Sequence, residues 1–467
     1  KKYQIAASLR LVDLWGTREA GFELPSLGLA GGLHTITRKE SIMVNRQPPQ
    51  GVIFGLPISL IWGFVAIAVF MTGDGIELAF LSRYVVDLGF SPTQATLLFT
   101  VYGFLAAISS WGSGVLAETF GPRRIMLIGV AAWIVFHVLF LIFGLEQQKY
   151  TLMVVFYGIR GLAYPLFIYA FMVWIAQVTP GARMASAMGW FWSMYCIGIG
   201  LLGNWIPSLS ISRIGFINTL WVGVFWVAVA GLMIMYLVKE RGAGKPDDAV
   251  TLVERLKTLS SGVTIIAERR GMFLIVLVRI ICNLSLFGLP VILPLYLTSV
   301  EVGFSMEQWL HLWGVMFVVS IFTNVIWGQI GDRLGWLIQM RWFGCIGCAL
   351  SSLAFYYLPQ FYGAHFEIAL IAAIGFGISV TAFVPMGAVF LALAPEQKGA
   401  AISAHNLAAG LSNFMGPGIA TLFIATLGIK GVVWIYAGLY VAGAVLTFFI
   451  PVPQPRLCQL RHCPRYA

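Results

Sequence analysis

Hydrophobic residues follow one another along this chain in long continuous runs, separated by short polar loops. About twelve runs reach the roughly 20 residues that a helix needs to cross ~30 Å of hydrocarbon. They cover 57–84, 94–117, 124–145, 151–177, 185–207, 217–238, 272–298, 307–330, 338–358, 366–393, 400–426 and 430–451. The runs do not alternate with period two, as the strands of a membrane barrel must, so we predict transmembrane helices.

A polar insertion divides the runs into two sets of six. It occupies 239–271, between the sixth and seventh runs. We therefore predict an all-α integral membrane protein with twelve transmembrane helices in two pseudo-symmetric bundles. The predicted segments are an N-terminal bundle over 53–238, a cytoplasmic linker over 239–271, a C-terminal bundle over 272–452 and a tail over 453–467. Residues 1–52 lack helical periodicity, and we expect them to be disordered or extraneous, with the biological start at Met43.

The two sets of runs repeat one another. "GVLAETFGPRR" follows the second run and "GQIGDRLGW" follows the eighth, so that Glu118 and Asp332 occupy equivalent places. Pro165 in the fourth run corresponds to Pro385 in the tenth. Tandem repeats of this kind imply a pseudo-twofold axis along the membrane normal and a binding site at mid-membrane between the halves.

Composition and charge agree with this architecture. The chain is 59% hydrophobic and only 10% charged, which excludes an ordinary soluble protein. If both termini are cytoplasmic, the inner loops hold thirteen Lys and Arg residues and the outer loops four. This bias follows the positive-inside rule. It also explains the net charge of +10 by contact with anionic membrane lipid, without a nucleic-acid partner.

The first run contains two carboxylates, Asp74 and Glu77, three residues apart. If the helix began at Val52, both acids would emerge into water. Pro57, however, is typical of a first helical position, and 57–71 would span only ~22 Å. We therefore expect the span to continue past Phe80 and to bury both acids against a cavity.

The fourth run contains Arg160 far from either end, where a guanidinium must face a carboxylate or water. Tyr157, Arg160 and Tyr164 share one helical stripe. The alternatives are that the tyrosines only pack between helices and that Arg160 forms a purely structural pair with Asp74 or Glu77.

The seventh and eleventh runs supply polar residues from the other half. Arg279 and Asn283 are four residues apart, and Arg279 could instead snorkel to the membrane surface. Asn283 is followed by Gly288, Pro290 and Pro294, which can break the helix and free backbone carbonyls.

Asn406 and Asn413 lie on one face of the eleventh run, where they either bind a ligand or join helices. The aromatic residues Trp190, Trp192 and Tyr195 are possible walls of a site, although packing explains each equally well. His137 is a lone histidine on an apolar helix, and we interpret it as structural.

Several chemistries have no support in the sequence. There is no His, Cys and carboxylate cluster with zinc spacing, no Walker Gly-Lys-Ser/Thr motif and no nucleophile-base constellation. We therefore expect no metal, no organic cofactor and no enzymatic activity. Cys345 and Cys348 form a CxxC spacing in an apolar run, where buried cysteines ordinarily act as small hydrophobic residues.

These motifs resemble the major facilitator superfamily of secondary transporters. The resemblance implies gating roles for the loop residues of both repeats: Gly114, Glu118, Gly121, Arg123, Arg124, Gly328, Asp332, Arg333 and Gly335. Thr119 departs from the basic residue that the family pattern expects, and the second copy reaches its next basic residue only at Arg341.

Longer segments, such as "FYGIRGLAYPLFIY" and "KGAAISAHNLAAGLSNF", resemble the enterobacterial pentitol permeases over 53–452. This resemblance implies uptake of a linear five-carbon polyol, ribitol or D-arabinitol, with a proton as the coupling ion. It also implies a functional monomer in the bacterial inner membrane. The alternatives are a carrier for another sugar, a sugar acid or a drug, and, in a different class, a membrane receptor.

A polyol needs amides, carboxylates and hydroxyls as hydrogen-bond partners. The residues that we expect to bind it are Asp74, Glu77, Tyr157, Arg160, Tyr164, Asn283, Asn406 and Asn413. For coupling, we expect a proton on Asp74 or Glu77 to release Arg160 and let the loaded carrier reorient. Glu118 with Arg123 and Arg124 would form the inner latch, with Glu118 facing the positive N-terminal end of the eleventh helix.

Overall fold

The structure is a computed structural model that describes residues 52–53, 56–179, 184–238 and 252–452. The predictions for 1–51, including the start at Met43, and for the tail over 453–467 therefore lie outside the described residues.

The described residues are almost entirely helical. The exception is a short hairpin in which β1 (Val52–Ile53) pairs antiparallel with β2 (Leu56–Pro57). Nine helical stretches within the described ranges are long and apolar enough to cross a membrane. Two of them, Ala187–Tyr236 and Gly399–Phe449, contain 50 and 51 residues and turn at Gly215 and Gly428, which are not helical. Counting two passes for each, together with the broken first span, agrees with the predicted twelve.

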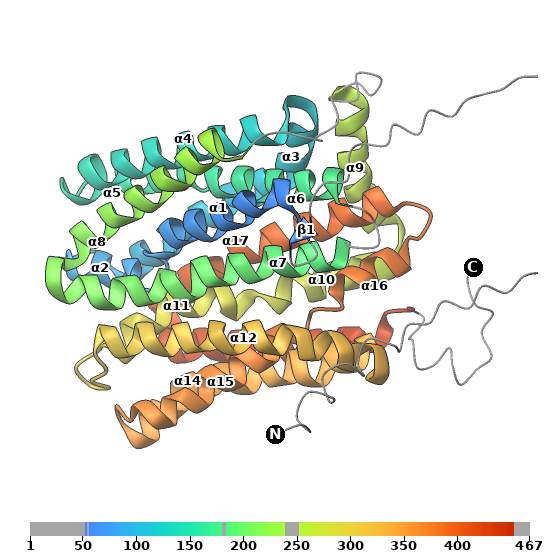
Figure 1. Cartoon of the computed structure of the whole chain (residues 1–467). Coiled ribbons are helices and arrows are strands. Elements are labelled where there is room, and N and C mark those ends of the chain that lie inside the picture. Colours follow the sequence, from blue (N-terminus) through green and yellow to red (C-terminus); the bar gives the residue numbers. More distant parts are fainter. Residues whose placement is uncertain (1–51, 54–55, 180–183, 239–251, 453–467) are drawn as a thin grey trace, which may run out of the picture. The chain divides into compact units, whose positions relative to one another are not determined.

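The N-terminal bundle precedes the linker in the chain (Figure 1). Its helices are α1 (Ile58–Gly75), α2 (Leu81–Asp87), α3 (Pro92–Phe120), α4 (Pro122–Leu139), α5 (Tyr150–Arg160), α6 (Ala163–Val178), α7 (Met184–Cys196) and α8 (Gly203–Tyr236). Two π-helical segments, η1 (Phe140–Leu145) and η3 (Ile197–Leu202), continue α4 and α7.

The C-terminal bundle follows the linker helix α9 (Leu252–Glu268). Its helices are α10 (Arg270–Cys282), α11 (Leu284–Leu297), α12 (Met306–Leu334), α13 (Trp336–Gln339), α14 (Gly347–Tyr362), α15 (Phe366–Thr381), α16 (Met386–Leu393) and α17 (Lys398–Leu446). The π-helical segment η4 (Met340–Ile346) joins α13 to α14, and a 3-10 turn, η5 (Thr447–Phe449), follows α17.

Matching helix starts confirm the internal repeat. The helices α3 and α12 both contain 29 residues and both begin with a capping box. The Ser91 hydroxyl accepts from the Gln94 amide at 3.2 Å, and the Gln94 side chain accepts from the Ser91 amide at 2.9 Å. Ser305 and Gln308 form the same pair of bonds at 3.1 and 2.9 Å. Each box satisfies two of the amides that a helix start leaves without partners.

The ends of the same helices explain the glycine that closes the loop motif in both repeats. Gly121 ends α3 and Gly335 ends α12, with φ values of +92° and +97°. Residues other than glycine rarely adopt this left-handed backbone conformation, so each repeat needs a glycine at this position. After Gly121 the chain starts α4, and Arg123 donates to the carbonyls of Ile234 and Met235 at the end of α8. The carbonyls at the C-terminus of α8 carry partial negative charge, which favours the positive charge of Arg123 there.

Four spans at equivalent positions of the repeat are broken. The breaks are Ile76–Phe80 in the first span, Gly161–Leu162 in the fourth, Asn283 in the seventh and Ala382–Pro385 in the tenth. A break at membrane depth leaves backbone groups that need polar neighbours or a cavity. The prediction that Pro290 and Pro294 break the seventh span was wrong. Both prolines are buried inside α11, which continues through them. Each proline removes one backbone hydrogen bond of the helix, so we infer that the close packing around α11 compensates for the loss.

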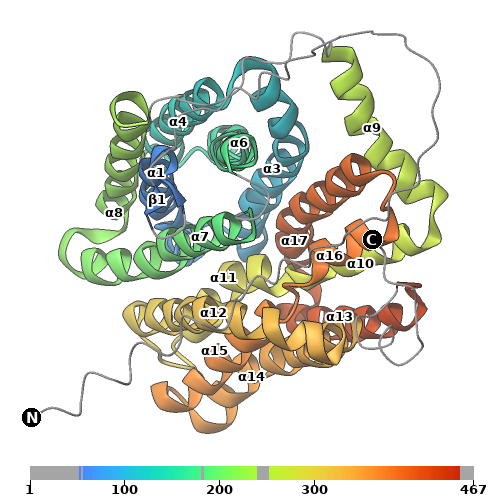
Figure 2. The same ribbon diagram turned by 45° about the vertical axis from the view of Figure 1, so that its right-hand side comes forward.

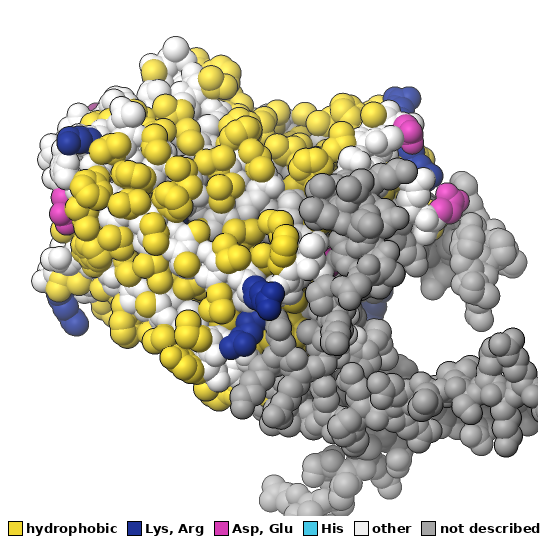
Figure 3. Space-filling view, turned by 90° about the horizontal axis from the view of Figure 1, so that it is seen from above, with side chains coloured by type: hydrophobic (Ala, Val, Ile, Leu, Met, Phe, Trp, Pro, Cys, Tyr) yellow, Lys and Arg dark blue, Asp and Glu magenta, His cyan; other side chains and the backbone are white. Residues whose placement is uncertain are grey.

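The outer surface suits lipid. The side chains of Phe225, Leu350 and Leu422 are 63%, 63% and 71% exposed. Exposing such large apolar side chains costs free energy in water but not among lipid acyl chains. In Figure 3 hydrophobic side chains cover most of the described surface in view, and many of the charged side chains lie near two opposite ends.

The linker is not merely a connection, because it contains α9, which packs against α17 and α3 (Figure 2). The Trp111 indole of α3 donates to the Ser403 hydroxyl of α17 at 3.3 Å. Ser403 in turn donates to the Leu259 carbonyl of α9 at 3.1 Å. One hydroxyl therefore joins both bundles and the linker.

The two bundles contact one another closely along α3 and α17. A Cβ added at Gly103 would lie 2.9 Å from the Phe414 Cα, and one added at Gly410 would lie 2.8 Å from the Ala107 Cα. The helices approach so closely because neither glycine has a side chain.

We expect Gly103→Val to lower thermal stability and to impair transport, because the added side chain forces the two backbones apart. Overpacking of this kind costs about 1–3 kcal/mol. The matched control is Gly112→Val on the same helix, where an added Cβ meets nothing within 4 Å. Thermal unfolding of the purified variants measures the difference, and equal destabilisation by both substitutions would contradict the assigned contact.

Candidate functional site

Both acids of the first span are buried, as predicted. Asp74 is 8% exposed and Glu77 3%. Asp74 lies in the last turn of α1, and Glu77 lies in the break that follows. The break separates the partners of the two acids, although the acids are only three positions apart in sequence.

Glu77 forms an ion pair with Arg160. Arg160 Nη1 donates to Glu77 Oε2 at 2.8 Å, and Nη2 contacts Oε1, so the pair is bidentate. Arg160 is fully buried at the end of α5, just before the break in the fourth span. Such a pair satisfies a buried charge through geometry that only a guanidinium provides.

Asp74 has a different environment. Its Oδ1 accepts from the Trp133 indole at 2.6 Å and from the Tyr102 hydroxyl at 3.4 Å. Within the described part of the chain, no cation lies at ion-pairing distance from this carboxylate. Asp74 is therefore held by neutral donors, and Glu77 by a charged one.

His137 belongs to this cluster, so the interpretation of it as an isolated structural histidine was incomplete. Arg160 Nη1 contacts His137 Nδ1, and His137 Nε2 lies 3.3 Å from the Leu220 carbonyl. Arginine can only donate, so Nδ1 accepts and Nε2 carries the proton that it donates to Leu220. His137 is neutral in this arrangement, and it helps to hold Arg160 in place.

Aromatic rings enclose the guanidinium. The Arg160 Cζ lies 4.6 Å from the ring centroid of Tyr157, 4.9 Å from that of Trp133 and 5.3 Å from that of Tyr102. The faces of these rings attract a cation. Tyr157, predicted from its helical stripe with Arg160, thus contacts the arginine directly.

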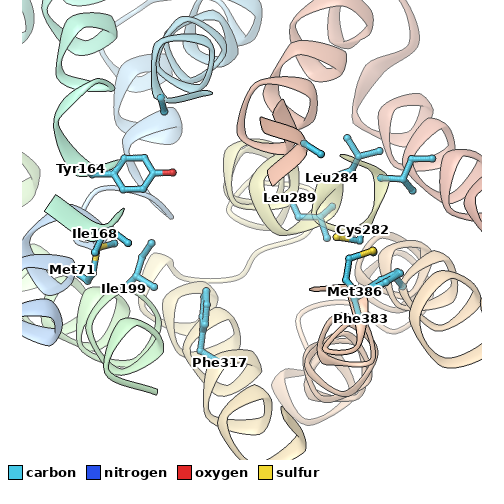
Figure 4. Close-up of a cluster of buried hydrophobic side chains, with 14 of the residues drawn as sticks. Met71, Tyr164, Ile168, Ile199, Cys282, Leu284, Leu289, Phe317, Phe383 and Met386 are labelled. Atoms are coloured by element: carbon cyan, nitrogen blue, oxygen red, sulfur yellow. The ribbon is translucent and has the colours of Figure 1, made fainter. Parts of the chain in front are cut away.

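Tyr164 connects the N-terminal cluster to the other bundle. Its ring stacks on Tyr102 with centroids 6.1 Å apart, and its hydroxyl accepts from the Asn413 amide at 2.8 Å. In Figure 4 the hydroxyl points away from Ile168 of α6, toward the side where Leu284 and Leu289 of the C-terminal bundle lie. Tyr164 and Asn413, predicted from opposite halves, therefore meet.

The remaining predicted polar residues gather around Arg279 in the C-terminal bundle. Arg279 Nε donates to His405 Nε2 at 3.3 Å, and Nη1 donates to Cys282 Sγ at 2.9 Å. Cys282 Sγ lies 3.5 Å from the Asn283 side-chain oxygen, and His405 Nδ1 lies 3.4 Å from that of Asn406. Arg279 thus points to α17 and not to the membrane surface, which excludes snorkelling in this conformation.

A cavity of about 500 Å³ lies between α7 and α12. Its lining residues are Met188, Gly189, Trp190, Trp192, Ser193, Cys196, Ile321, Asn324, Val325 and Val384. Trp190 and Trp192, which the sequence suggested as walls, are among them. Tyr195 contributes a ring against Trp192, with centroids 5.5 Å apart.

Beyond this cavity the bundles touch at the ends of the helices away from the basic loops. Ser208 bonds with His311 at 3.2 Å. The Trp309 indole of α12 donates to the Ala79 carbonyl, inside the break of the first span, at 2.7 Å. On the side of α7 and α12, the boundary is therefore packed at the end away from the basic loops and hollow toward the other end.

The predicted gating residues lie in the last turns of α3 and α12, at the glycines that end them, and in the first turn of α4. Glu118, Arg124 and Arg333 are exposed, and the side chain of Asp332 lies outside the described residues. An added Cβ at Gly114 or Gly328 would meet nothing within 4 Å. Their gating role remains a prediction.

Sequence reasoning missed Trp133, Tyr102 and His137. Trp133 and His137 lie four residues apart on α4, with rings stacked at 4.3 Å. Two rings that can form hydrogen bonds, four residues apart in an apolar span, are the signal in the sequence that could have indicated Trp133 and His137. Among the described residues, no group of three or more His, Cys, Asp or Glu side chains is arranged to hold a metal ion.

The sequence is similar to those of known membrane transporters. The sequence profile of the Major Facilitator Superfamily matches residues 62–386. The ribitol transporter of Klebsiella pneumoniae is 49% identical over 88% of this chain and 96% of its own length. The D-arabinitol transporter of the same organism is 50% identical over 86% of this chain and 94% of its own.

A solved structure shares the fold. The D-xylose–proton symporter superposes with a TM-score of 0.62 over 87% of this chain and 99% of its own. At 15% sequence identity this likeness concerns the fold alone.

Proposed function

The chain belongs to the Major Facilitator Superfamily of membrane transporters, and we propose that it imports a linear pentitol, ribitol or D-arabinitol, by proton symport. The observation that supports the substrate class most strongly is the near-half identity to two pentitol transporters over almost their whole lengths.

The chemistry of the interior fits an uncharged polyol. Tyr164 and Asn413 offer a hydroxyl and an amide where the bundles meet. Asn283 and Asn406 add two more amides on the C-terminal side. Such groups donate and accept without carrying charge, as a chain of hydroxyls requires.

Proton coupling is proposed for Asp74. Asp74 accepts only from neutral donors, so it would lose little interaction energy when it takes up a proton. Glu77 would lose its bidentate ion pair with Arg160. Asp74 thus becomes the proposed coupling residue, and the Glu77–Arg160 pair its fixed neighbour. The boundary between α7 and α12, packed at one end and hollow at the other, supports alternating access by reorientation of the two halves.

We place the carrier in a bacterial inner membrane with both termini in the cytoplasm. It would act as a monomer surrounded by membrane lipid, with the proton as its coupling ion. The proposal includes no cofactor, no nucleic-acid partner and no enzymatic step.

Uptake of labelled pentitols by cells that express the chain tests the proposal. We expect ribitol or D-arabinitol to accumulate against its gradient and a protonophore to abolish the accumulation. One proton moving through 100 mV supplies ~2.3 kcal/mol, which sustains roughly 50-fold accumulation of a neutral solute. Cells with the empty vector provide the control. Uptake of another sugar, a sugar acid or a drug but of no pentitol would overturn the substrate assignment.

A further inference from the structure

The two intramembrane arginines of the site differ in their partners. Arg160 is fully buried, bidentate with Glu77 and enclosed by three aromatic rings. A ligand could reach this guanidinium only by displacing Glu77. Arg160 is therefore occupied by the protein itself.

Arg279 has no such partner. Within the described residues, its side chain donates hydrogen bonds to the neutral His405 nitrogen and the Cys282 sulfur, and no carboxylate lies at ion-pairing distance. His405 Nε2 must accept from arginine, so it carries no proton there and adds no negative charge. Arg279 is also partly exposed, so part of the guanidinium remains accessible.

The position of Arg279 is central. It lies nine residues after Arg270, the start of α10, which is about 14 Å along the helix. The Ser412 hydroxyl of α17 donates to the Arg279 carbonyl at 3.2 Å. Ser412 precedes Asn413, whose amide reaches Tyr164 of the other bundle. Arg279 thus lies in the layer where the two bundles meet.

A charged group at this depth is costly unless a partner or a ligand compensates it. We propose that Arg279 is a carboxylate subsite, and that the carrier also binds five-carbon polyhydroxy carboxylates, the pentonates that correspond to its pentitols. The carboxylate would accept from the accessible edge of the guanidinium, and the hydroxyls would use the amides that serve a pentitol. This proposal rests on the proposed pentitol transport for its carbon-chain length.

Calorimetric titration of the purified full-length protein tests the subsite directly. The probes are ribitol, D-arabinitol and the sodium salts of the matching pentonates, with sodium chloride at equal ionic strength. We expect the wild type to bind a pentonate. We also expect Arg279→Gln to weaken pentonate binding about 10- to 100-fold, the range for a lost charge-assisted bond, and to weaken pentitol binding several-fold less.

Two further variants keep the result interpretable. Arg279→Lys retains the charge and should weaken pentonate binding less than Arg279→Gln does, even if the glutamine variant folds poorly. Arg213→Gln removes an exposed positive charge in α8, two residues before the turn at Gly215, and should change neither affinity. The subsite is overturned if the wild type binds no pentonate, or if Arg279→Gln weakens pentonate and pentitol binding equally.

The same titration separates this inference from the proposed function. Arg279-dependent binding of a pentonate without binding of either pentitol would support the subsite and overturn the pentitol assignment. Binding of a pentitol without binding of any pentonate would support the pentitol assignment and overturn the subsite.

Discussion

Asp74→Asn is expected to abolish uphill accumulation of the pentitol while leaving its exchange across the membrane intact. Asparagine keeps the shape of the side chain and an oxygen that accepts from the Trp133 indole, which lies 2.6 Å from Oδ1 of Asp74. It cannot take up and release a proton. The accumulation driven by the membrane potential, roughly 50-fold at 100 mV, should fall until the inner and outer concentrations are equal.

Vesicles loaded with unlabelled substrate distinguish a coupling defect from a binding defect. Counterflow of labelled pentitol needs binding and reorientation but no proton gradient, so it should persist in Asp74→Asn. The matched control is Asp87→Asn, which removes the carboxylate of a surface pair with Arg83 in the same span. Normal proton-driven accumulation by Asp74→Asn would show that Asp74 does not couple transport.

Arg160→Gln is expected to destabilise the protein strongly, by about 3–5 kcal/mol, because it leaves Glu77 charged and buried without its partner. The loss would appear as a lower midpoint of thermal unfolding of the purified protein. Arg83→Gln breaks an ion pair whose side chains are 29% and 40% exposed, and such surface pairs contribute little. It should therefore leave the midpoint almost unchanged.

The double variant Glu77→Gln with Arg160→Gln separates stability from transport. Removing both charges leaves neither group uncompensated, so stability should largely return. Transport should not return, because Tyr157, Trp133 and Tyr102 would surround a neutral amide. A double variant as unstable as Arg160→Gln would mean that the arginine stabilises the bundle through its ring contacts and not through Glu77.

Much of the fold could be predicted from the sequence. The lengths of the apolar runs predicted the spans, and the glycine-rich loops predicted the repeat that the matching starts at Ser91 and Ser305 confirm. Burial of Asp74 and Glu77 followed from helix length alone, since a span ending at Met71 is too short. These inferences succeed because membrane thickness and backbone hydrogen bonding leave few alternatives.

The sequence could not decide which of the two acids pairs with Arg160. Asp74 and Glu77 are three residues apart, and a continuous helix would have placed them on one face with shared partners. The break at Ile76–Phe80 instead directs one toward Trp133 and the other toward Arg160. Aromatic residues are frequent throughout this chain, so hydrophobicity did not distinguish Trp133 and Tyr102 from ordinary packing residues. The helix α9 inside the linker was likewise not predicted.

The bonds that meet at Ser403 bear on how fast the carrier can turn over. Any movement that separates α3 from α17 at this level must break the bond from Trp111, and a shift of α9 must break the bond to Leu259. Each such bond contributes about 0.5–1.5 kcal/mol net, which corresponds to a rate factor of roughly 2 to 12. Ser403 lies apart from the polar layer formed by Tyr164 and Asn413, so we expect these bonds to add to the activation barrier of the proposed reorientation without contacting the substrate. We expect the linker helix α9 to slow the proposed reorientation through its bond with Ser403.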